Sequence, residues 1–321
     1  MSKKNPLNPR HQRSIFSLLL HHQLLLMRYK YYLAAASAFT IWGLFSFVLK
    51  PLHHYPSPDI LFYRIFFCVV LMVVTNLLFR RKDIIATKSK LALLEPKTRR
   101  NLMALTVVSS VMLAGNWFFF IYVMNHVSVK AASFAYLVCP ILTTVFAFII
   151  LKEQLTKLQW FSVILSALSC TLLSINNFND VFYSIVVAAT YAIYLVLQKK
   201  FAGIDKFLLL TVQLLITSVI LLPFYPVYSG PLPAEAAFYG YILIIAIGFT
   251  IIPMLLNLYA LKGLDSSTLG ILLYINPIIG FLLAAFYYNE PISALQIAAY
   301  AIIVVSIAIF NVGSYLKVKN I

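Results

Sequence analysis

The sequence predicts an all-α integral membrane protein whose ten transmembrane helices form two inverted five-helix repeats. Three observations predict this fold class: an apolar composition, long runs without charged residues, and an internal repeat. Of the 321 residues, 62% are hydrophobic and only 11% are charged, and the mean hydropathy is +0.91. So few charges cannot solvate the surface of a globular protein of this size.

The charge-free runs predict the individual helices. Most approach the roughly 20 residues that cross about 30 Å of hydrocarbon. The second run reaches this length only if it begins near Ile60 and includes Arg64. The runs lack the alternation typical of barrel strands, so helices are expected. The predicted helices cover residues 31–49, 60–79, 101–129, 131–151, 158–179, 181–198, 207–234, 236–261, 266–289 and 291–316.

The basic residues indicate which loops face the cytoplasm. With the N-terminus inside, the 25 Lys and Arg residues fall on the cytoplasmic side, except Lys50 and Lys130 outside and Arg64 within the second helix. This bias predicts a multi-pass protein of the cell inner (plasma) membrane with both termini cytoplasmic. The net charge of +16 then reflects loops that face anionic lipid, and it requires no nucleic-acid partner.

The two ends are predicted to lie outside the helices, with residues 1–29 as a cytoplasmic extension and 317–321 as a cytoplasmic tail. The apolar stretch "SIFSLLLHHQLLLM" is short, contains two histidines and lacks a cleavage site, which argues against a signal peptide. Either Met1 or Met27 could be the natural start. The three cysteines fall inside predicted helices without disulfide or metal spacing, so we interpret them as packing residues.

The internal repeat predicts the architecture. At an offset of 137 residues, "CPILTTVFAFIILKEQLTKLQ" aligns with "NPIIGFLLAAFYYNEPISALQ", which places Pro140 on Pro277 and Glu153 on Glu290. The chain is therefore expected to consist of two repeats, residues 30–176 and 180–316. Because five is odd, the second repeat must be inserted upside down relative to the first.

The first part of each repeat aligns at a different offset, 149 residues. Trp42 then falls on Tyr191 and Arg64 on Gln213. The loop over residues 80–100 accounts for the difference, because the corresponding loop in the second half is shorter.

Several motifs resemble the RarD-like branch of the EamA drug/metabolite transporter superfamily. They are "IWGLFSFVLK", "DILFYR", "NWFFFIYVMNHVSVKAASFAYLVCP", "LKEQLTKLQW", "SSTLGILLYINP" and "FYYNEP", in that order along nearly the whole chain beyond residue 30. The resemblance implies a ten-helix bacterial inner-membrane exporter. The family pattern has Asn where this chain has Cys139, and often Gln where it has Leu273, so the resemblance does not carry a substrate with it.

Charged residues inside a membrane are costly and are therefore candidates for function. All nine carboxylates lie in loops or at helix ends, which disfavours a proton relay at the membrane centre. Two hypotheses stay open: facilitated diffusion or exchange, and coupling through a carboxylate at a rim. Arg64 also has two interpretations. It could hold a carboxylate or phosphate of the substrate, or it could snorkel outward or pair with Asp59 or Asp180.

Polar and aromatic residues within the predicted helices suit a small amphipathic solute. Each taken alone could equally be a packing residue or an interfacial anchor. Pro140 and Pro277 each remove a helical hydrogen bond, and they are the candidates for gating. The predicted substrate-binding residues are Trp42, Arg64, Asn116, Trp117, Tyr136, Tyr191, Gln213, Asn257, Tyr274 and Asn276.

These features favour a transporter that exports a small metabolite or drug-like amphiphile by alternating access. The partners considered are the small-molecule substrate, the lipid bilayer and, as an open alternative to a monomer, a second copy of the chain. No enzyme motif is present, and no metal or cofactor is expected. The alternatives are a membrane-embedded enzyme or a channel without a recognisable motif.

Overall fold

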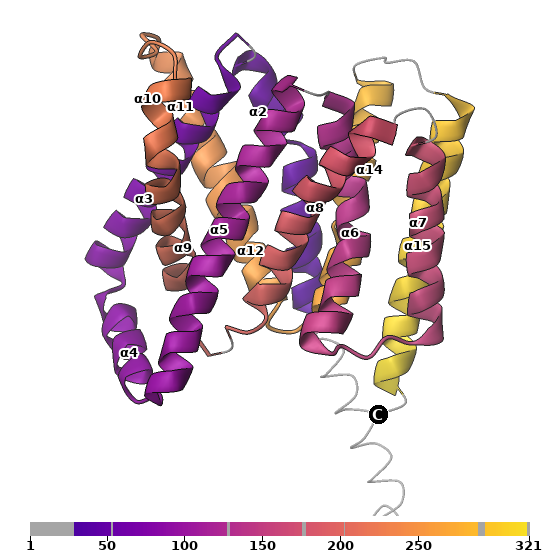
Figure 1. Cartoon of the computed structure of the whole chain (residues 1–321), viewed down its shortest axis with the longest axis horizontal. Coiled ribbons are helices and arrows are strands. Elements are labelled where there is room, and N and C mark those ends of the chain that lie inside the picture. The colour runs from indigo at the N-terminus through magenta and orange to yellow at the C-terminus, as the bar shows by residue number, and fades with distance from the viewer. Residues whose placement is uncertain are drawn as a thin grey trace, which may run out of the picture.

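The computed structural model is a bundle of helices that run side by side (Figure 1). It describes residues 29–52, 54–126, 129–174, 178–201, 203–287 and 293–319. Within these ranges the chain forms helices and connecting turns, without strands. Residues 1–28 of the predicted extension over 1–29 lie outside the described residues, as does Glu290.

The first half of the chain begins with a helix over 29–43 that continues into the short segments α2 (Ser46–Leu49) and η1 (Lys50–Leu52). The helices that follow are α3 (Ser57–Phe79), α4 (Arg81–Ala92), α5 (Pro96–His126), α6 (Val129–Leu151) and α7 (Lys157–Ser174).

The second half contains more interruptions. Its elements are α8 (Phe178–Gln198), α9 (Lys206–Leu221) with η2 (Leu222–Phe224) and α10 (Tyr225–Tyr228), α11 (Ala236–Ala246), the π-helical segment η3 (Ile247–Ile251), α12 (Ile252–Ala260), α13 (Ser266–Leu272), α14 (Ile275–Phe286) and α15 (Ala294–Lys319).

Seven helical segments in the described residues are long and apolar enough to cross a membrane. Three more apolar helices are shorter: Ala135–Leu151, Lys157–Leu173 and Phe182–Gln198. The chain is therefore a multi-pass, all-helical membrane protein.

The segment over residues 80–100 differs from the expectation of a plain loop, because it contains α4. Asp83 lies in the first turn of α4 and Lys90 in its last turn, where the helix dipole favours each charge. Figure 1 places α4 at the same end of the bundle as the end of α15.

The bundle exposes apolar side chains and buries small polar ones, as expected for helices that face lipid. On α7, Phe161, Ile164 and Leu168 are exposed, whereas Ser162 and Ser166 are buried. The buried serines contact α15. Ser162 Oγ donates to Ser306 O at 2.6 Å, Ser169 Oγ donates to Ala299 O at 2.7 Å, and the hydroxyls of Ser166 and Ser306 are 2.5 Å apart. Small side chains and hydroxyl contacts therefore hold this antiparallel pair together.

Helices α3 and α9–α10 form a second antiparallel pair, on the opposite side of the bundle from α7 and α15 (Figure 1). Residue numbers rise along one member as they fall along the other. From end to end, contacts join Asp59 to Gly230, Tyr63 to Tyr225, Asn76 to Thr211, and Arg80 to Asp205.

Helices α7 and α15 begin with the same capping box. Thr156 N donates to Gln159 Oε1 at 2.8 Å and Gln159 N to Thr156 Oγ1 at 3.2 Å. Ser293 N donates to Gln296 Oε1 at 2.9 Å and Gln296 N to Ser293 Oγ at 3.2 Å. Each box satisfies backbone donors that a helix start leaves free, which gives a physical reason for the repeated glutamine.

Candidate functional site

The indole of Trp42 and the phenol of Tyr191 meet edge to face at the centre of the bundle, with ring centroids 6.3 Å apart. The buried amide of Asn257 joins them, because its Nδ2 donates to Tyr191 Oη at 3.4 Å. Asn257 Oδ1 is also buried, and no hydrogen-bond donor reaches it from the described residues. The first, sixth and eighth predicted helices thus contribute Trp42, Tyr191 and Asn257, which we call the central group, and the amide of this group keeps a free acceptor.

Trp42 also binds the backbone of the eighth predicted helix. Its Nε1 donates to the carbonyl of Phe249, within η3, at 2.9 Å. Pro253 stands four residues after Phe249 and has no N–H, so this carbonyl lacks its ordinary α-helical donor. The indole supplies a donor in place of the missing amide.

Arg64 extends from α3 over the ring of Trp117 on α5, with the guanidinium carbon 4.9 Å from the ring centroid. Its Nε is buried and has no hydrogen-bond partner among the described residues. The guanidinium also lies within electrostatic range of the Tyr136 hydroxyl and the Cys68 thiol. Tyr136 in turn packs against Phe120, with ring centroids 5.5 Å apart.

The expected pairing of Arg64 with Asp59 is not observed. Both carboxylate oxygens of Asp59 instead accept from the backbone N–H of Gly230, at 3.1 and 3.2 Å. The side chain of Asp180, the other expected partner, lies outside the description. Arg64 is therefore a half-buried cation with a buried, unpaired Nε and without a carboxylate partner in the described part of the chain.

Gln213 lies beside the central group and leads to two residues that the sequence analysis missed. Its Nε2 donates to Gln198 Oε1 at 3.3 Å, and its Oε1 accepts from Tyr194 Oη at 3.5 Å. Tyr194 also stacks on Tyr191, with ring centroids 6.0 Å apart. The spacing of residues 191, 194 and 198 places them on one helix face, and this periodicity was the signal available in the sequence.

The structure does not bring the remaining predicted residues into this group in the same way. Asn116 Nδ2 donates to Val187 O at 2.9 Å, which ties α5 to α8 and gives the amide a packing role. Tyr274 packs in a separate cluster with Cys170 and Phe310, near α7 and α15. Asn276 is half-buried in the first turn of α14.

The two candidate gating prolines lie in different local structures. Helix α6 continues through Pro140, and the hydroxyl of Thr144 donates to the Pro140 carbonyl at 3.0 Å. In the other copy the helix is interrupted between α13 and α14, and Pro277 follows this break in the first turn of α14. The break lies one turn before the proline, and the Leu273 carbonyl, which loses its α-helical donor to Pro277, accepts from Asn276 N at 3.0 Å instead.

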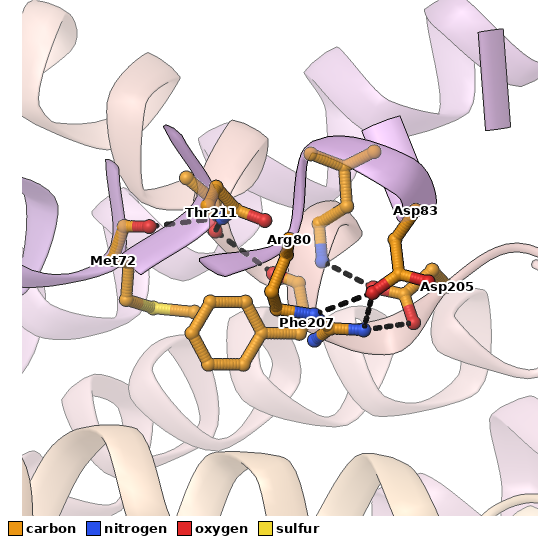
Figure 2. A network of polar contacts seen from close by, with 8 residues as sticks. Met72, Arg80, Asp83, Asp205, Phe207 and Thr211 are labelled. Atoms are coloured by element: carbon orange, nitrogen blue, oxygen red, sulfur yellow. Dashed lines mark hydrogen bonds and ion pairs between the residues drawn. The ribbon is translucent and has the colours of Figure 1, made fainter. Parts of the chain in front are cut away.

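Charged contacts link the two halves of the chain at the ends of helices. Figure 2 shows Arg80 between Asp83 and Asp205, with the ring of Phe207 beside it. Arg80 Nε donates to Asp83 Oδ2 at 2.8 Å, and Arg80 Nη2 donates to Asp205 Oδ2 at 2.9 Å. Partial burial lowers the pKa of Arg80, but the hydrogen bonds and charges of both carboxylates outweigh this effect and raise it, so Arg80 stays charged.

A second contact between the halves involves Glu153. Lys152, with φ 57°, ends α6 in the left-handed conformation, and Glu153 N donates back to Ala147 O at 3.3 Å. This turn positions the Glu153 carboxylate at the start of α13. There it accepts from Ser266 N at 2.8 Å, Ser267 N at 3.1 Å and Ser267 Oγ at 2.6 Å.

The described residues contain no group of three or more His, Cys, Asp or Glu side chains that could hold a metal ion. The three cysteines are free and buried. The central group and the surroundings of Arg64 together offer aromatic surface, uncharged polar atoms and one cation. These are features that bind an organic solute.

Comparison with known proteins agrees with this description. The sequence profile of the EamA-like transporter family matches residues 29–175 and again 180–312. Protein RarD of Escherichia coli K12 is 31% identical over 87% of this chain and 92% of its own length. The uncharacterized transporter YojE of Bacillus subtilis 168 is 29% identical over 86% of this chain and 91% of its own.

A solved crystal structure shares the fold, with a TM-score of 0.71 over 89% of this chain and 98% of the other, at 16% sequence identity. The apolar helices, the two profile matches and the RarD relatives agree with one another. The chain belongs to the EamA-like transporter family, and within it to the RarD-like proteins.

Proposed function

We propose that this protein is an inner-membrane carrier that exports a small metabolite or drug-like amphiphile by alternating access. Its ten helices would form two inverted repeats, residues 30–176 and 180–316. The central group around Trp42, Tyr191 and Asn257 would contact the solute, and both termini would lie in the cytoplasm.

One observation carries the proposal: contacts between the halves map onto each other when the halves are exchanged. At the offset of 137, the pair Ser162–Ser306 becomes positions 169 and 299, and Ser169 donates to Ala299 O. The offset of 149 applies to the other antiparallel pair. There the Asn76–Thr211 contact becomes positions 62 and 225, where the rings of Phe62 and Tyr225 lie 5.4 Å apart.

This exchange symmetry supports an axis in the membrane plane. Trp42 and Tyr191 correspond to each other at the offset of 149 and are in contact, so the axis would pass between them. The two separate matches to the family profile, and the repeated capping boxes, support the same division. In carriers built from inverted repeats, the solute site lies where the repeats meet.

The test is counterflow by the purified full chain in proteoliposomes, with a panel of amino acids, nucleobases, organic acids and amphiphilic drugs on either side of the membrane. A carrier gives saturable uptake of labelled solute that is stimulated by the same solute on the opposite side. Conductance that does not saturate would identify a channel and overturn the proposal. Chemical conversion of the solute would identify an enzyme.

A further inference from the structure

We propose that Arg64 binds the carboxylate of the transported solute, so that the substrate is a small organic anion with an apolar body. This inference rests on the proposed transport function, and it identifies the chemical class of the substrate. It arises from a comparison of two arginines at opposite ends of the same helix.

Arg64 and Arg80 have similar aromatic neighbours. The guanidinium carbon of Arg80 lies 4.8 Å from the Phe207 ring centroid, and that of Arg64 lies 4.9 Å from the Trp117 ring centroid. Figure 2 shows that Arg80 also has two carboxylates, and its side chain is still 25% exposed. Both arginines are half-buried, but the protein supplies full ionic partners only to Arg80 among the described residues.

Arg64 has no such partner in the described residues. Both ion pairs in the described residues belong to Arg80. Asp59, five residues before Arg64, accepts a hydrogen bond from the backbone N–H of Gly230 instead. Arg64 lies within the candidate membrane span Pro58–Phe79. A cation there without an anion is costly, because the surrounding helices and lipid cannot replace its hydration. A cation–π contact offsets part of this cost, but it uses the face of the guanidinium and leaves its N–H donors free. An incoming anion would complete the site.

The surroundings of Arg64 indicate which anion. Among the described residues, the groups that act on the Arg64 guanidinium are the Tyr136 hydroxyl and the Cys68 thiol, so Arg64 is the one charge described at this site. One guanidinium matches one carboxylate through two parallel hydrogen bonds, whereas a phosphate dianion would keep an unbalanced charge. The rings of Trp117 and Phe120 provide apolar surface for the rest of the solute.

The experiment uses pairs of solutes that differ only in charge: benzoate and benzamide, phenylacetate and phenylacetamide, hexanoate and hexanamide. Binding to the full-length protein in detergent is measured by thermal shift and by tryptophan fluorescence, since Trp117 adjoins the site. At least one acid should bind, and its amide should bind far more weakly. Arg64→Gln should weaken binding of that acid by at least about 30-fold, as for a lost charge-assisted pair.

Arg80→Gln is the matched control, because it removes a guanidinium at a similar distance from an aromatic ring. Loss of the Arg80–Asp205 contact acts on acids and amides alike, so the ratio of acid to amide affinity should stay that of the wild type. Arg64→Lys keeps the charge but not the planar fork, so it should bind the acid with intermediate affinity. If Arg64→Gln fails to fold, the comparison of each acid with its amide on the wild-type protein still tests whether the site binds a carboxylate. Amides that bind as well as acids, or a panel in which no acid binds, would overturn the inference.

Counterflow of the same solutes separates this inference from the proposed function. Arg64-dependent binding of acids without any counterflow would leave the anion site standing and refute the carrier. Counterflow that is saturable but equal for acids and amides, and unchanged in Arg64→Gln, would support the carrier and refute the anion site.

Discussion

At the scale of single residues, Trp42 has a role that its aromatic ring alone does not explain. Pro253 deprives the Phe249 carbonyl of its α-helical donor, and the indole N–H of Trp42 replaces that donor at 2.9 Å. The helix around this carbonyl widens into the π-helical segment η3, where Thr250 Oγ1 donates to Ile245 O at 3.0 Å. An irregular backbone inside a membrane protein needs such partners, because lipid supplies none.

Trp42→Phe should therefore destabilise the protein by about 1 kcal/mol, since the ring remains but the donor is lost. Pro253→Ala restores a backbone N–H that can serve the Phe249 carbonyl. Trp42→Phe should then cost less in the Pro253→Ala background than in the wild type. Unfolding by denaturant in detergent measures all four proteins of this double-mutant cycle. Equal costs in the two backgrounds would refute the replacement of one donor by the other.

The sequence could identify Trp42 and Tyr191 as related positions but not as neighbours. Their correspondence in the repeat suggested equivalence, and only the packing of the two halves shows that the rings meet. Tyr194 and Gln198 were missed because their spacing shows a shared helix face but does not identify a polar partner for either side chain. Their importance comes from Gln213, which reaches them from another helix.

At the scale of helices, the α3 and α9–α10 pair is fastened at both ends. At one end the N-terminal carboxylate of α3, Asp59, accepts from Gly230, just beyond α10. At the other, Asp205 caps α9 by accepting from Leu208 N at 2.9 Å and also binds Arg80, just beyond α3. Each helix thus begins with a carboxylate that holds the end of its partner.

Breaking the Arg80–Asp205 contact should loosen that end of the pair. Both side chains are partly exposed, at 25% and 30%, so their coupling should be only about 0.5–1 kcal/mol and should fall with added salt. If this contact closes one side of the carrier, Asp205→Asn should speed the modification of a cysteine introduced at the buried position Thr211 by a soluble maleimide.

Asp83→Asn is the control for this prediction. It removes the other carboxylate on Arg80, but Asp83 belongs to the same half of the chain as Arg80, so the link between the halves persists. Equal modification rates for Asp205→Asn and Asp83→Asn would argue against an inter-helix closure.

Sequence patterns predicted the equivalent prolines of the two copies but not where each helix breaks. Pro140 and Pro277 occupy equivalent positions, and the same bend was expected in both copies, yet α6 is continuous and its counterpart is split. A close tertiary contact joins the two copies beside this difference. Gly270 in α13 presses so closely on Thr143 of α6 that a Cβ at position 270 would lie 2.8 Å from the Thr143 Cβ. Such a contact cannot be read from a proline's position.

At the scale of the whole molecule, composition and charge-free runs predict the all-helical membrane fold because the bilayer leaves few alternatives. The helical segment over 80–100 was not predicted, since its residues are polar and basic and resemble a solvated loop. The order of helices around the bundle also could not be predicted, because lipid-facing and buried faces are both rich in apolar residues. Small polar residues mark the buried faces, as the serines between α7 and α15 illustrate.

The orientation of this bundle in the membrane can be tested with single cysteines. Ser89 lies exposed on α4, among the basic residues predicted to face the cytoplasm, whereas Leu232 lies exposed beyond α10, in a segment without basic residues. The native cysteines are buried and should not interfere. A membrane-impermeant maleimide applied to intact cells should label Leu232→Cys and spare Ser89→Cys until the membrane is opened. Because basic loops resist translocation, replacing the Lys and Arg residues of 80–100 with Gln should make Ser89→Cys partly reactive from outside. Labelling of Ser89→Cys in intact cells without those replacements would reverse the predicted orientation and place both termini outside.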